Sequence, residues 1–221
     1  MKEYTIEKLL DLSHTEAAEL FSGKIYPWEV LGEIHDFILE TGRQLNPEEY
    51  EQRGEHLWVA KSAKIADTAC INGPAIIGEE AEIRHCAFIR GDVIVGAGAV
   101  VGNSTELKNC VLFHKVQVPH YNYVGDSILG YRAHMGAGSI CSNVKSDKQL
   151  VVVKADGQRM ETGRKKFGAV LGDLVEVGCG SVLNPGTVIG RESHIYPLSF
   201  VRGCVPGGSI YKQAGEIVGR R

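Results

Sequence analysis

The chain has 221 residues, of which 43% are hydrophobic and 23% charged, and its formal net charge of −3 does not favour a nucleic-acid-binding protein. It contains no run of about 18 apolar residues, so neither a membrane-spanning helix nor a membrane partner is expected. The N-terminus lacks a signal-peptide core and the six cysteines are scattered without a C-x-x-C pair, which together indicate reduced thiols in a cytoplasmic protein.

The N-terminal segment, 1–57, lacks any repeat and is predicted to form short helices. Ser13-His14-Thr15-Glu16 is typical of a capping box that opens a helix through Phe21. Pro27 is expected to begin a second helix that ends at Asn46-Pro47. Its apolar residues recur at helical spacing, at Trp28, Leu31, Ile34, Ile38 and Leu39. This segment carries 5 Lys or Arg against 13 Asp or Glu, and the remainder carries 19 against 14. Two interpretations stay open: ordinary surface variation, or a basic domain that receives anionic ligands.

A six-residue repeat begins at residue 58 and dominates the rest of the chain. Large apolar residues recur at Val59, Ile65, Ile71, Ile77, Ile83, Ile89, Val95, Val101, Leu107 and Phe113. A second row follows four residues later and is small or β-branched in all but its last member, at Ala63, Ala69, Ala75, Ala81, Ala87, Val93, Ala99, Thr105, Val111 and Gln117. This period predicts a parallel β-helix, in which each hexapeptide forms one side of a triangular coil and the large residue points inward.

The repeat changes phase once and is interrupted once. Residues 119–122 are interpreted as an insert, after which the large residues fall at Tyr123, Leu129, Met135 and Cys141. The pattern lapses over residues 147–164, which are predicted to form an extruded loop with a hairpin turn at Asp156-Gly157. It then resumes at Leu171, Val177, Leu183, Ile189, Ile195 and Val201. We therefore expect a helical segment over 1–57, a β-helix over 58–211 and a tail over 212–221.

A regular prism needs no charged residues on its repeat rows, so Arg90, Lys108, His120 and Tyr123 stand out. Here the chain resembles a known family. Residues 87–91, 105–109, 119–126 and 135–143, with their H-x-x-Y-x-G-D and G-A-G-x-x-x-x-N blocks, are similar to the acetyltransferase domain of the bifunctional N-acetylglucosamine-1-phosphate uridyltransferase/glucosamine-1-phosphate acetyltransferase. Residues 163–173 and 183–190 resemble archaeal sugar-1-phosphate nucleotidylyltransferases that also acetylate amino sugars. The resemblance covers residues 26–211 and implies a left-handed β-helix of the hexapeptide-repeat transferase type.

The resemblance implies an acetyl-CoA-dependent N-acetyltransferase that acts on an amino-sugar 1-phosphate. His120 would be the general base, because an imidazole ordinarily exchanges its proton near neutral pH. Arg90 and Lys108 would bind the sugar phosphate. The remaining sugar contacts would come from Tyr123, His134, Asn143 and Lys166, and the acetyl-CoA groove would be lined by Ala137, Cys179 and Pro197. No metal is expected. Because His134 and Val144 replace the family's asparagine and tyrosine, the amino sugar is open between glucosamine and galactosamine 1-phosphate.

Other interpretations follow from the same residues. The block Ile89-Arg90-Gly91-Asp92 also resembles γ-type carbonic anhydrases, in which case His85, His114 and His120 would be zinc ligands, which must converge on the metal. A third interpretation is a non-catalytic trimeric subunit that docks a separate sugar nucleotidyltransferase. The segment 1–57 contains no Gly-rich phosphate loop, so nucleotidyl transfer is not expected. A homotrimer is expected, with Lys166 or the 147–164 loop reaching an adjacent subunit. The run Arg164-Lys165-Lys166 is interpreted as a solvated basic stretch or as a contact for CoA phosphates.

Overall fold

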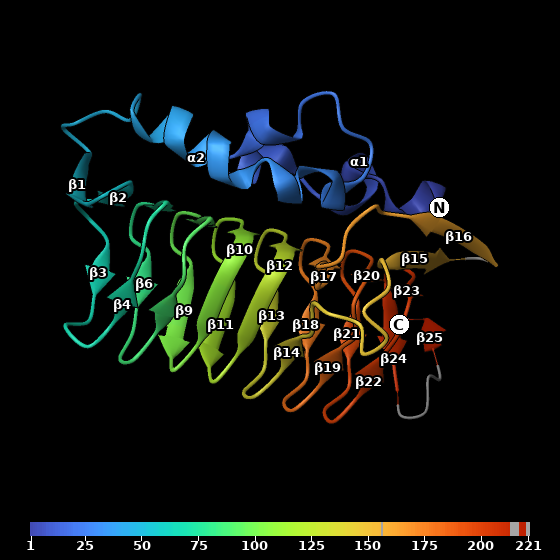
Figure 1. Ribbon diagram of the computed structural model, residues 1–221. Coiled ribbons are helices and arrows are strands. Elements are labelled where there is room, and N and C mark those ends of the chain that lie inside the picture. Colours follow the sequence, from blue (N-terminus) through green and yellow to red (C-terminus); the bar gives the residue numbers. More distant parts are fainter. Residues whose placement is uncertain (156, 213–216, 220–221) are drawn as a thin grey trace.

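The computed structural model describes residues 1–155, 157–212 and 217–219. Short parallel strands wind into a long triangular prism, and an N-terminal helical segment lies along one of its sides (Figure 1). The predicted left-handed β-helix is therefore confirmed. None of the helices in the described part of the chain is long and apolar enough to cross a bilayer.

The prism has three faces, which the chain visits in the order 1, 3, 2. Face 1 contains β2 (Leu57–Ala60), β5 (Ala75–Ile77), β8 (Val93–Val95), the second halves of β10 (Glu106–Leu112) and β12 (Tyr123–Leu129), β17 (Ala169–Leu171), β20 (Thr187–Ile189) and β23 (Cys204–Val205). Face 2 contains β4 (Cys70–Ile71), β7 (Phe88–Ile89), the first halves of β10 and β12, β14 (Ile140–Cys141), β19 (Val182–Leu183) and β22 (Phe200–Val201). Face 3 contains β3 (Lys64–Ile65), β6 (Glu82–Ile83), β9 (Val100–Asn103), β11 (Gln117–His120), β13 (His134–Met135), β18 (Glu176–Val177), β21 (His194–Ile195) and β24 (Ser209–Tyr211). Two antiparallel strands, β1 (Tyr50–Gly54) and β25 (Ile217–Gly219), pair with β2 and β24.

The core is a stack of large apolar residues, one from each strand of each face. On face 1 the stack runs through Val59, Ile77, Val95, Leu112, Leu129, Leu171, Ile189 and Val205, all almost fully buried. The second row is also buried, as at Ala81, Ala99 and Thr105. The rows read from the sequence therefore identify the interior as far as Leu107 and again from Leu129 to Val201, because a prism has room for one large side chain per hexapeptide.

The phase change arises at two shortened corners, and the predicted insert at residues 119–122 is wrong. Ile76 pairs with Ile94, which lies three full hexapeptides further along the chain. The next two coils, from Ile94 to Val111 and from Val111 to Ile128, are each one residue shorter. Each missing residue falls at the corner between faces 2 and 1. Consequently Leu112 and Val124 point inward, in place of the predicted Phe113 and Tyr123.

The shortened corners are centred on Asn109 and Asp126, whose φ angles are 47° and 48°. Asn and Asp adopt positive φ more readily than other non-glycine residues, so both suit a tight corner. Residues 119–122 form an ordinary corner, since the inward residues Val118 and Val124 are six positions apart. His120 therefore lies at the end of β11, at a corner of regular length.

The N-terminal segment covers the outer side of face 1. It consists of η1 (Lys2–Tyr4), α1 (Ile6–Leu9), η2 (Leu12–His14), η3 (Ala18–Phe21), η4 (Pro27–Gly32) and α2 (Ile34–Gly42). The outward residues of face 1 are apolar and at most 6% exposed, at Trp58, Ile76, Ile94, Val111 and Ile128. Gly42 lies against Trp58 so closely that a Cβ atom would fall 2.3 Å from the indole ring. Face 1 is thus buried on both sides, and faces 2 and 3 carry the accessible surface of the coil.

The helix signals in this segment are only partly correct. The capping box predicted at Ser13-His14-Thr15-Glu16 does not form: the Asp11 carboxylate accepts from the Ser13 amide, and the Glu16 carboxylate accepts from the Ala97 amide at 3.2 Å. Glu16 therefore docks the segment onto the prism. The predicted second helix is two elements: the 3-10 helix η4 begins at Pro27, and α2 follows it and ends at Gly42, before Asn46-Pro47.

A loop leaves the coil between β14 and β17 and contains an antiparallel hairpin, β15 (Val152–Ala155) and β16 (Gln158–Glu161). Ile140 pairs with Val182, which lies seven hexapeptides further along the chain, whereas a regular coil takes three. The segment without a repeat, 147–164, is therefore only part of the insertion. Val151 and Val153 are fully buried, which anchors the hairpin. The turn residue Asp156 and most of the predicted tail, residues 213–216 and 220–221, lie outside the described residues.

Candidate active site

Four of the predicted site residues form one column at the corner between faces 3 and 2. The register pairs Gln117 with His134, His134 with Glu176 and Glu176 with His194. Three residues after each member of this register lies a second set of aligned positions, which is the column. Its members are His120, Ala137, Cys179 and Pro197. Backbone hydrogen bonds link the successive coils: the Gly138 amide donates to the His120 carbonyl at 3.0 Å, and the Gly180 amide to the Ala137 carbonyl at 2.8 Å. We call this set the corner column.

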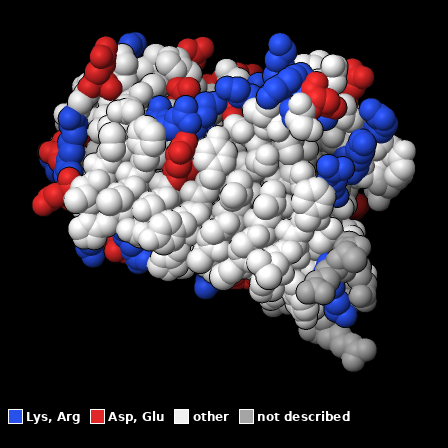
Figure 2. All heavy atoms as spheres, turned by 60° about the horizontal axis from the view of Figure 1, so that its bottom comes forward, with Lys and Arg blue, Asp and Glu red and all other residues white. Residues whose placement is uncertain are grey.

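The corner column is open to solvent. All four of its residues are exposed, and the two between His120 and Pro197 have small side chains. The adjoining corner positions hold Tyr121, Gly138, Gly180 and Leu198, and Tyr121 and Leu198 are 65% and 81% exposed. In Figure 1 β11 runs down to the lower edge, and Figure 2, which brings that edge forward, shows a broad surface with few charged side chains.

Asn122 holds the corner that presents His120, a role that the sequence interpretation missed. Its side-chain carbonyl accepts from the His120 amide at 3.1 Å, and its amide group donates to the Gly136 carbonyl at 2.9 Å and to the Ser139 hydroxyl. Only 2% of Asn122 is exposed. The asparagine inside H-x-x-Y was visible in the sequence, but nothing in the repeat pattern showed that it is buried.

Three further predicted residues lie on face 2, around a carboxylate to which no role was assigned. Asp126 is 4% exposed and accepts from Lys108 Nζ at 3.3 Å and from Asn109 Nδ2 at 2.9 Å. Asn143 Nδ2 donates to Asp126 Oδ2 and also to the Tyr123 hydroxyl at 3.2 Å. We call Lys108, Asn109, Tyr123, Asp126 and Asn143 the Asp126 cluster. Burial, followed by the nearby Asp126 charge, raises the pKa of Tyr123, so the phenol stays protonated and able to donate.

Both predicted phosphate ligands are paired with carboxylates in the free chain. Arg90 Nη1 lies 2.7 Å from Glu106 Oε1, and this hydrogen bond raises the pKa of the Arg90 guanidinium. Lys108 is held by Asp126. A phosphate bound by Arg90 and Lys108 would therefore share them with Glu106 and Asp126.

Arg164 is not the solvated residue that its basic run suggested. It is partly buried, its Nε lies 3.4 Å from the Trp28 carbonyl oxygen, and burial lowers the pKa of its guanidinium. Gly32 permits this approach, since a Cβ atom there would lie 2.6 Å from Arg164 Nη2. Lys166 is exposed, and its backbone bridges to Val144 where the loop leaves and rejoins the coil.

His134 lies apart from the other predicted sugar contacts within one chain. It is on the outer side of face 3, where its Nδ1 lies 2.7 Å from Glu176 Oε2. The structure thus brings Lys108, Tyr123 and Asn143 together on face 2 with Arg90 nearby, and it aligns His120 with the CoA positions. It does not bring His134 to either group, and the backbone of Lys166 adjoins the Asp126 cluster through Val144, which follows Asn143.

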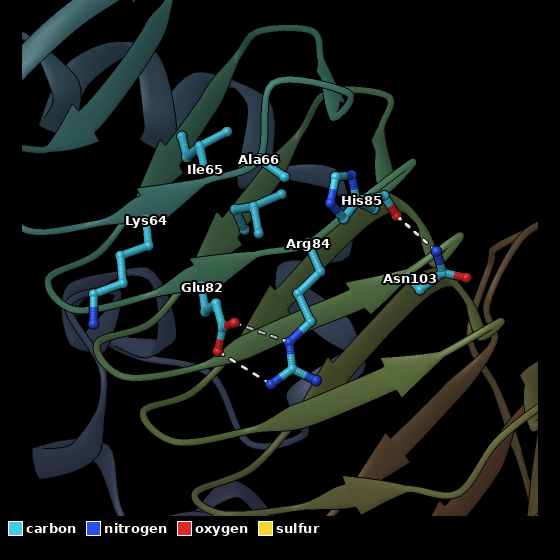
Figure 3. Close-up of a pocket in the computed structure, with 8 residues that line it drawn as sticks. Lys64, Ile65, Ala66, Glu82, Arg84, His85 and Asn103 are labelled. Carbon is cyan, nitrogen blue, oxygen red and sulfur yellow. Dashed lines mark hydrogen bonds and ion pairs between the residues drawn. The ribbon is translucent and has the colours of Figure 1, made fainter.

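A separate pocket on face 3 contains none of the residues predicted for acetyl transfer. It has a volume of about 480 Å³ and its polar lining includes Lys64, Glu82, Arg84, His85 and Asn103 (Figure 3). Arg84 pairs with Glu82 through two nitrogens at 3.0 and 3.1 Å. The charges of Glu82 and Arg84 in this lining are therefore already paired with each other.

The three histidines of the zinc interpretation have different surroundings. His85 Nδ1 lies 2.7 Å from the Thr68 hydroxyl, and His114 Nε2 lies 3.3 Å from Glu16 beneath the N-terminal segment. His120 is exposed at the corner column. Within the described residues of one chain, no group of three His, Cys, Asp or Glu side chains is arranged to hold a metal ion.

Comparison with known proteins identifies the family. A family model described as the GMPPB C-terminal domain matches residues 71–191, which is more than half of the chain. The chain belongs to the GMPPB C-terminal domain family. The match spans face 2 from β4 to β19, and so it includes both the Asp126 cluster and most of the corner column.

Two curated relatives match this chain over less than half of their own length. The chain is 32% identical over 166 residues to the bifunctional sugar-1-phosphate nucleotidylyltransferase/acetyltransferase of Sulfurisphaera tokodaii, covering 67% of this chain and 41% of that protein. It is 30% identical over 211 residues to the bifunctional protein GlmU of Methanococcus maripaludis strain C5, covering 86% of this chain and 47% of that protein. The chain thus spans less than half of these two relatives.

One relative is of similar size. The chain is 30% identical over 179 residues to the uncharacterized acetyltransferase YaiX of Escherichia coli strain 536, covering 72% of this chain and 77% of that protein. The resemblance read from the sequence blocks, to bifunctional nucleotidyltransferase/acetyltransferases, is confirmed.

Proposed function

We propose that this chain is an acetyl-CoA-dependent N-acetyltransferase that acts on an amino-sugar 1-phosphate. The observation that carries the proposal is the alignment of His120 with Ala137, Cys179 and Pro197 at one edge of face 2, whose outer side holds Arg90, Lys108, Tyr123 and Asn143. The relatives named as nucleotidyltransferase/acetyltransferases support the same reaction class.

The chemistry is a direct acyl transfer. The sugar amine attacks the thioester carbonyl carbon, the new C–N bond forms, and the C–S bond breaks to release CoA. His120 accepts the proton that the amine loses and returns it to the departing sulfur. Arg90 and Lys108 would orient the sugar through its phosphate, while Tyr123 and Asn143 would hold hydroxyl groups.

The extended acetyl-CoA arm would follow the corner column. Ala137 and Cys179 leave the backbone of two consecutive coils accessible beside His120, so a narrow chain can run along the prism axis there. Pro197 lies three coils from His120, which is about 14 Å at the usual strand spacing of about 4.8 Å.

A homotrimer is part of this proposal. Face 2 exposes a row of large apolar side chains, with Phe88 and Ile140 each 37% exposed and Phe200 57% exposed. Burying them against a neighbouring prism would remove apolar surface from water. An alternative role, a non-catalytic trimer that docks a separate nucleotidyltransferase, predicts the same association without acyl transfer.

The direct test is CoA release from acetyl-CoA with glucosamine 1-phosphate and galactosamine 1-phosphate as acceptors, followed with a thiol reagent. Release that depends on the amino-sugar phosphate supports the proposal, and the ratio of kcat/KM between the two sugars identifies the preferred acceptor. No release with either sugar, from a protein that light scattering shows to be trimeric, supports the non-catalytic role instead.

A further inference from the structure

A cavity of about 500 Å³ lies between the extruded loop and the C-terminal end of face 2. Its walls come from three places: the start of the loop at residues 144–147, the hairpin of β15 and β16, and the outer side of face 2 at Asn184 and Arg202. We call it the hairpin pocket. None of the residues predicted to act on or bind the sugar phosphate or acetyl-CoA lines it, although Val144, one of the two positions that left the amino sugar open, does.

The lining of the hairpin pocket is strongly basic. It includes Lys145, Lys154, Arg159 and Arg202, and among the described lining residues Asp147 is the one acid. Asp147 is already engaged, since its Oδ2 lies 3.1 Å from Lys145 Nζ. In the described part of the chain, no acidic side chain lies within ion-pair distance of the other three cations.

Two of these cations face each other across the hairpin. Lys154 on β15 is the direct partner of Arg159 on β16. Like charges at directly opposed positions destabilise a strand pair, and a two-stranded hairpin has little stability to spare. An anion bound between the two side chains would attract both of them and so offset their mutual repulsion.

The third cation is held in place from a different element. The Arg202 guanidinium carbon lies 5.0 Å from the centre of the Phe200 ring, a cation–π geometry that restricts the side chain. Arginine guanidinium groups match the geometry of phosphate oxygens through paired N–H donors. The pocket therefore offers two guanidinium groups and one ammonium group from two separate structural elements.

We propose that the hairpin pocket binds the phosphoryl groups of a small phosphate ester or diphosphate. The site is distinct from the Arg90 and Lys108 pair. Register places Lys108, Gly125, Ser142, Asn184 and Arg202 in one outer row of face 2, so Lys108 and Arg202 are four coils apart, about 19 Å. The inference rests on the charges and walls of this cavity and stands independently of the proposed acyl transfer.

The test is calorimetric titration of the full chain with three probes: inorganic pyrophosphate, adenosine 3′,5′-bisphosphate and UDP. Wild-type protein should bind pyrophosphate, and Lys154→Gln/Arg159→Gln should weaken binding at least tenfold, because it removes two of the cations that would pair with the phosphoryl oxygens. Arg202→Gln, on the other wall, should weaken it severalfold. The control Lys115→Gln/Lys148→Gln removes the same charge from exposed positions outside the cavity and should change the dissociation constant less than twofold.

The probes also distinguish the source of the phosphoryl group. Tighter binding of adenosine 3′,5′-bisphosphate assigns the pocket to the nucleotide end of a CoA ester, and tighter binding of UDP assigns it to a nucleotide sugar. Absence of binding by wild-type protein to all three probes, or an equal loss in the control variant, overturns the proposal. Unchanged thermal unfolding of the variants shows that a loss of binding is not a loss of fold.

Discussion

Asn109 and Asp126 occupy two successive shortened corners of the prism, and Asn109 Nδ2 donates to Asp126 Oδ1 at 2.9 Å. Asn109 also donates to the Leu31 carbonyl of the N-terminal segment at 3.0 Å. Asn109 thus links the N-terminal segment to the buried carboxylate of Asp126, which in turn holds the polar cluster on face 2.

Asp126→Ala should destabilise the protein strongly. It removes one of the two acceptors of Asn109 and of Asn143 and leaves Lys108 without its counter-charge. We therefore expect a loss of about 3–5 kcal/mol in the free energy of unfolding. Urea unfolding measures it. Asp92→Ala is the matched control, since Asp92 lies at the same edge but pairs with the exposed His35, and it should cost less than about 1 kcal/mol. Equal losses in the two variants would show that Asp126 has no special role.

The cysteines should divide into reactive and protected thiols. All six are thiols and not disulfides; Cys70, Cys86 and Cys179 are exposed, whereas Cys110 and Cys141 are buried. Burial raises the pKa of Cys141 to about 12 and also raises that of Cys110, so little thiolate forms at either residue. With a thiol reagent at pH 8, the three exposed cysteines should react promptly, and Cys110 and Cys141 should react only after unfolding. Fast labelling of Cys141 in the native protein would contradict this account.

The same burial predicts loss of stability at alkaline pH. The pKa of Cys141 in the folded protein lies above its ordinary value of 9.0, so folding favours the protonated thiol. The stability gained is complete below pH 9 and falls as the pH rises toward about 12. The urea midpoint should therefore decline between pH 9 and pH 11, and Cys141→Ala should decline less steeply than wild type. Parallel curves for the two proteins would contradict the shift.

Gly42→Ala should weaken the attachment of α2 to face 1. Alanine is ordinarily the better helix former by about 1 kcal/mol, but here its Cβ would overlap the Trp58 ring. We expect a net loss of about 1–3 kcal/mol, the usual cost of overpacking. Gly54→Ala, where the nearest atom would be 3.9 Å away, is the control and should be nearly neutral. A stabilised Gly42→Ala variant would show that α2 can shift without cost.

The prism was predictable because its interior repeats every six residues and every inward position must be apolar. The cover on face 1 also left a signal: Ile76 beside Ile77, and Val93-Ile94-Val95, are continuous apolar runs, as expected for strands buried on both sides. The exact phase of the repeat was less predictable, because the loss of one residue at an outer corner still leaves an apolar residue at each inward position.

The site was recognised in part for the same reason. Lys108, His120 and Tyr123 stood out as polar residues on an apolar repeat. Asp126 and Asn122 did not, because aspartate and asparagine are ordinary at corners and only the stacking of coils shows them to be buried. The separation of His134 from Asn143 depends on which face each strand joins, and the two shortened corners obscured that assignment.

The central claim is that His120 removes the proton from an amine acetylated at the corner column. The decisive measurement is kcat for acetyl transfer to the preferred amino-sugar 1-phosphate by wild type, His120→Ala and the control His85→Ala, which alters another exposed histidine at the same corner. His120→Ala should lower kcat by about 10²–10⁴-fold with little change in KM for the sugar phosphate, and His85→Ala should retain full activity. A His120→Ala protein with wild-type kcat would contradict the account.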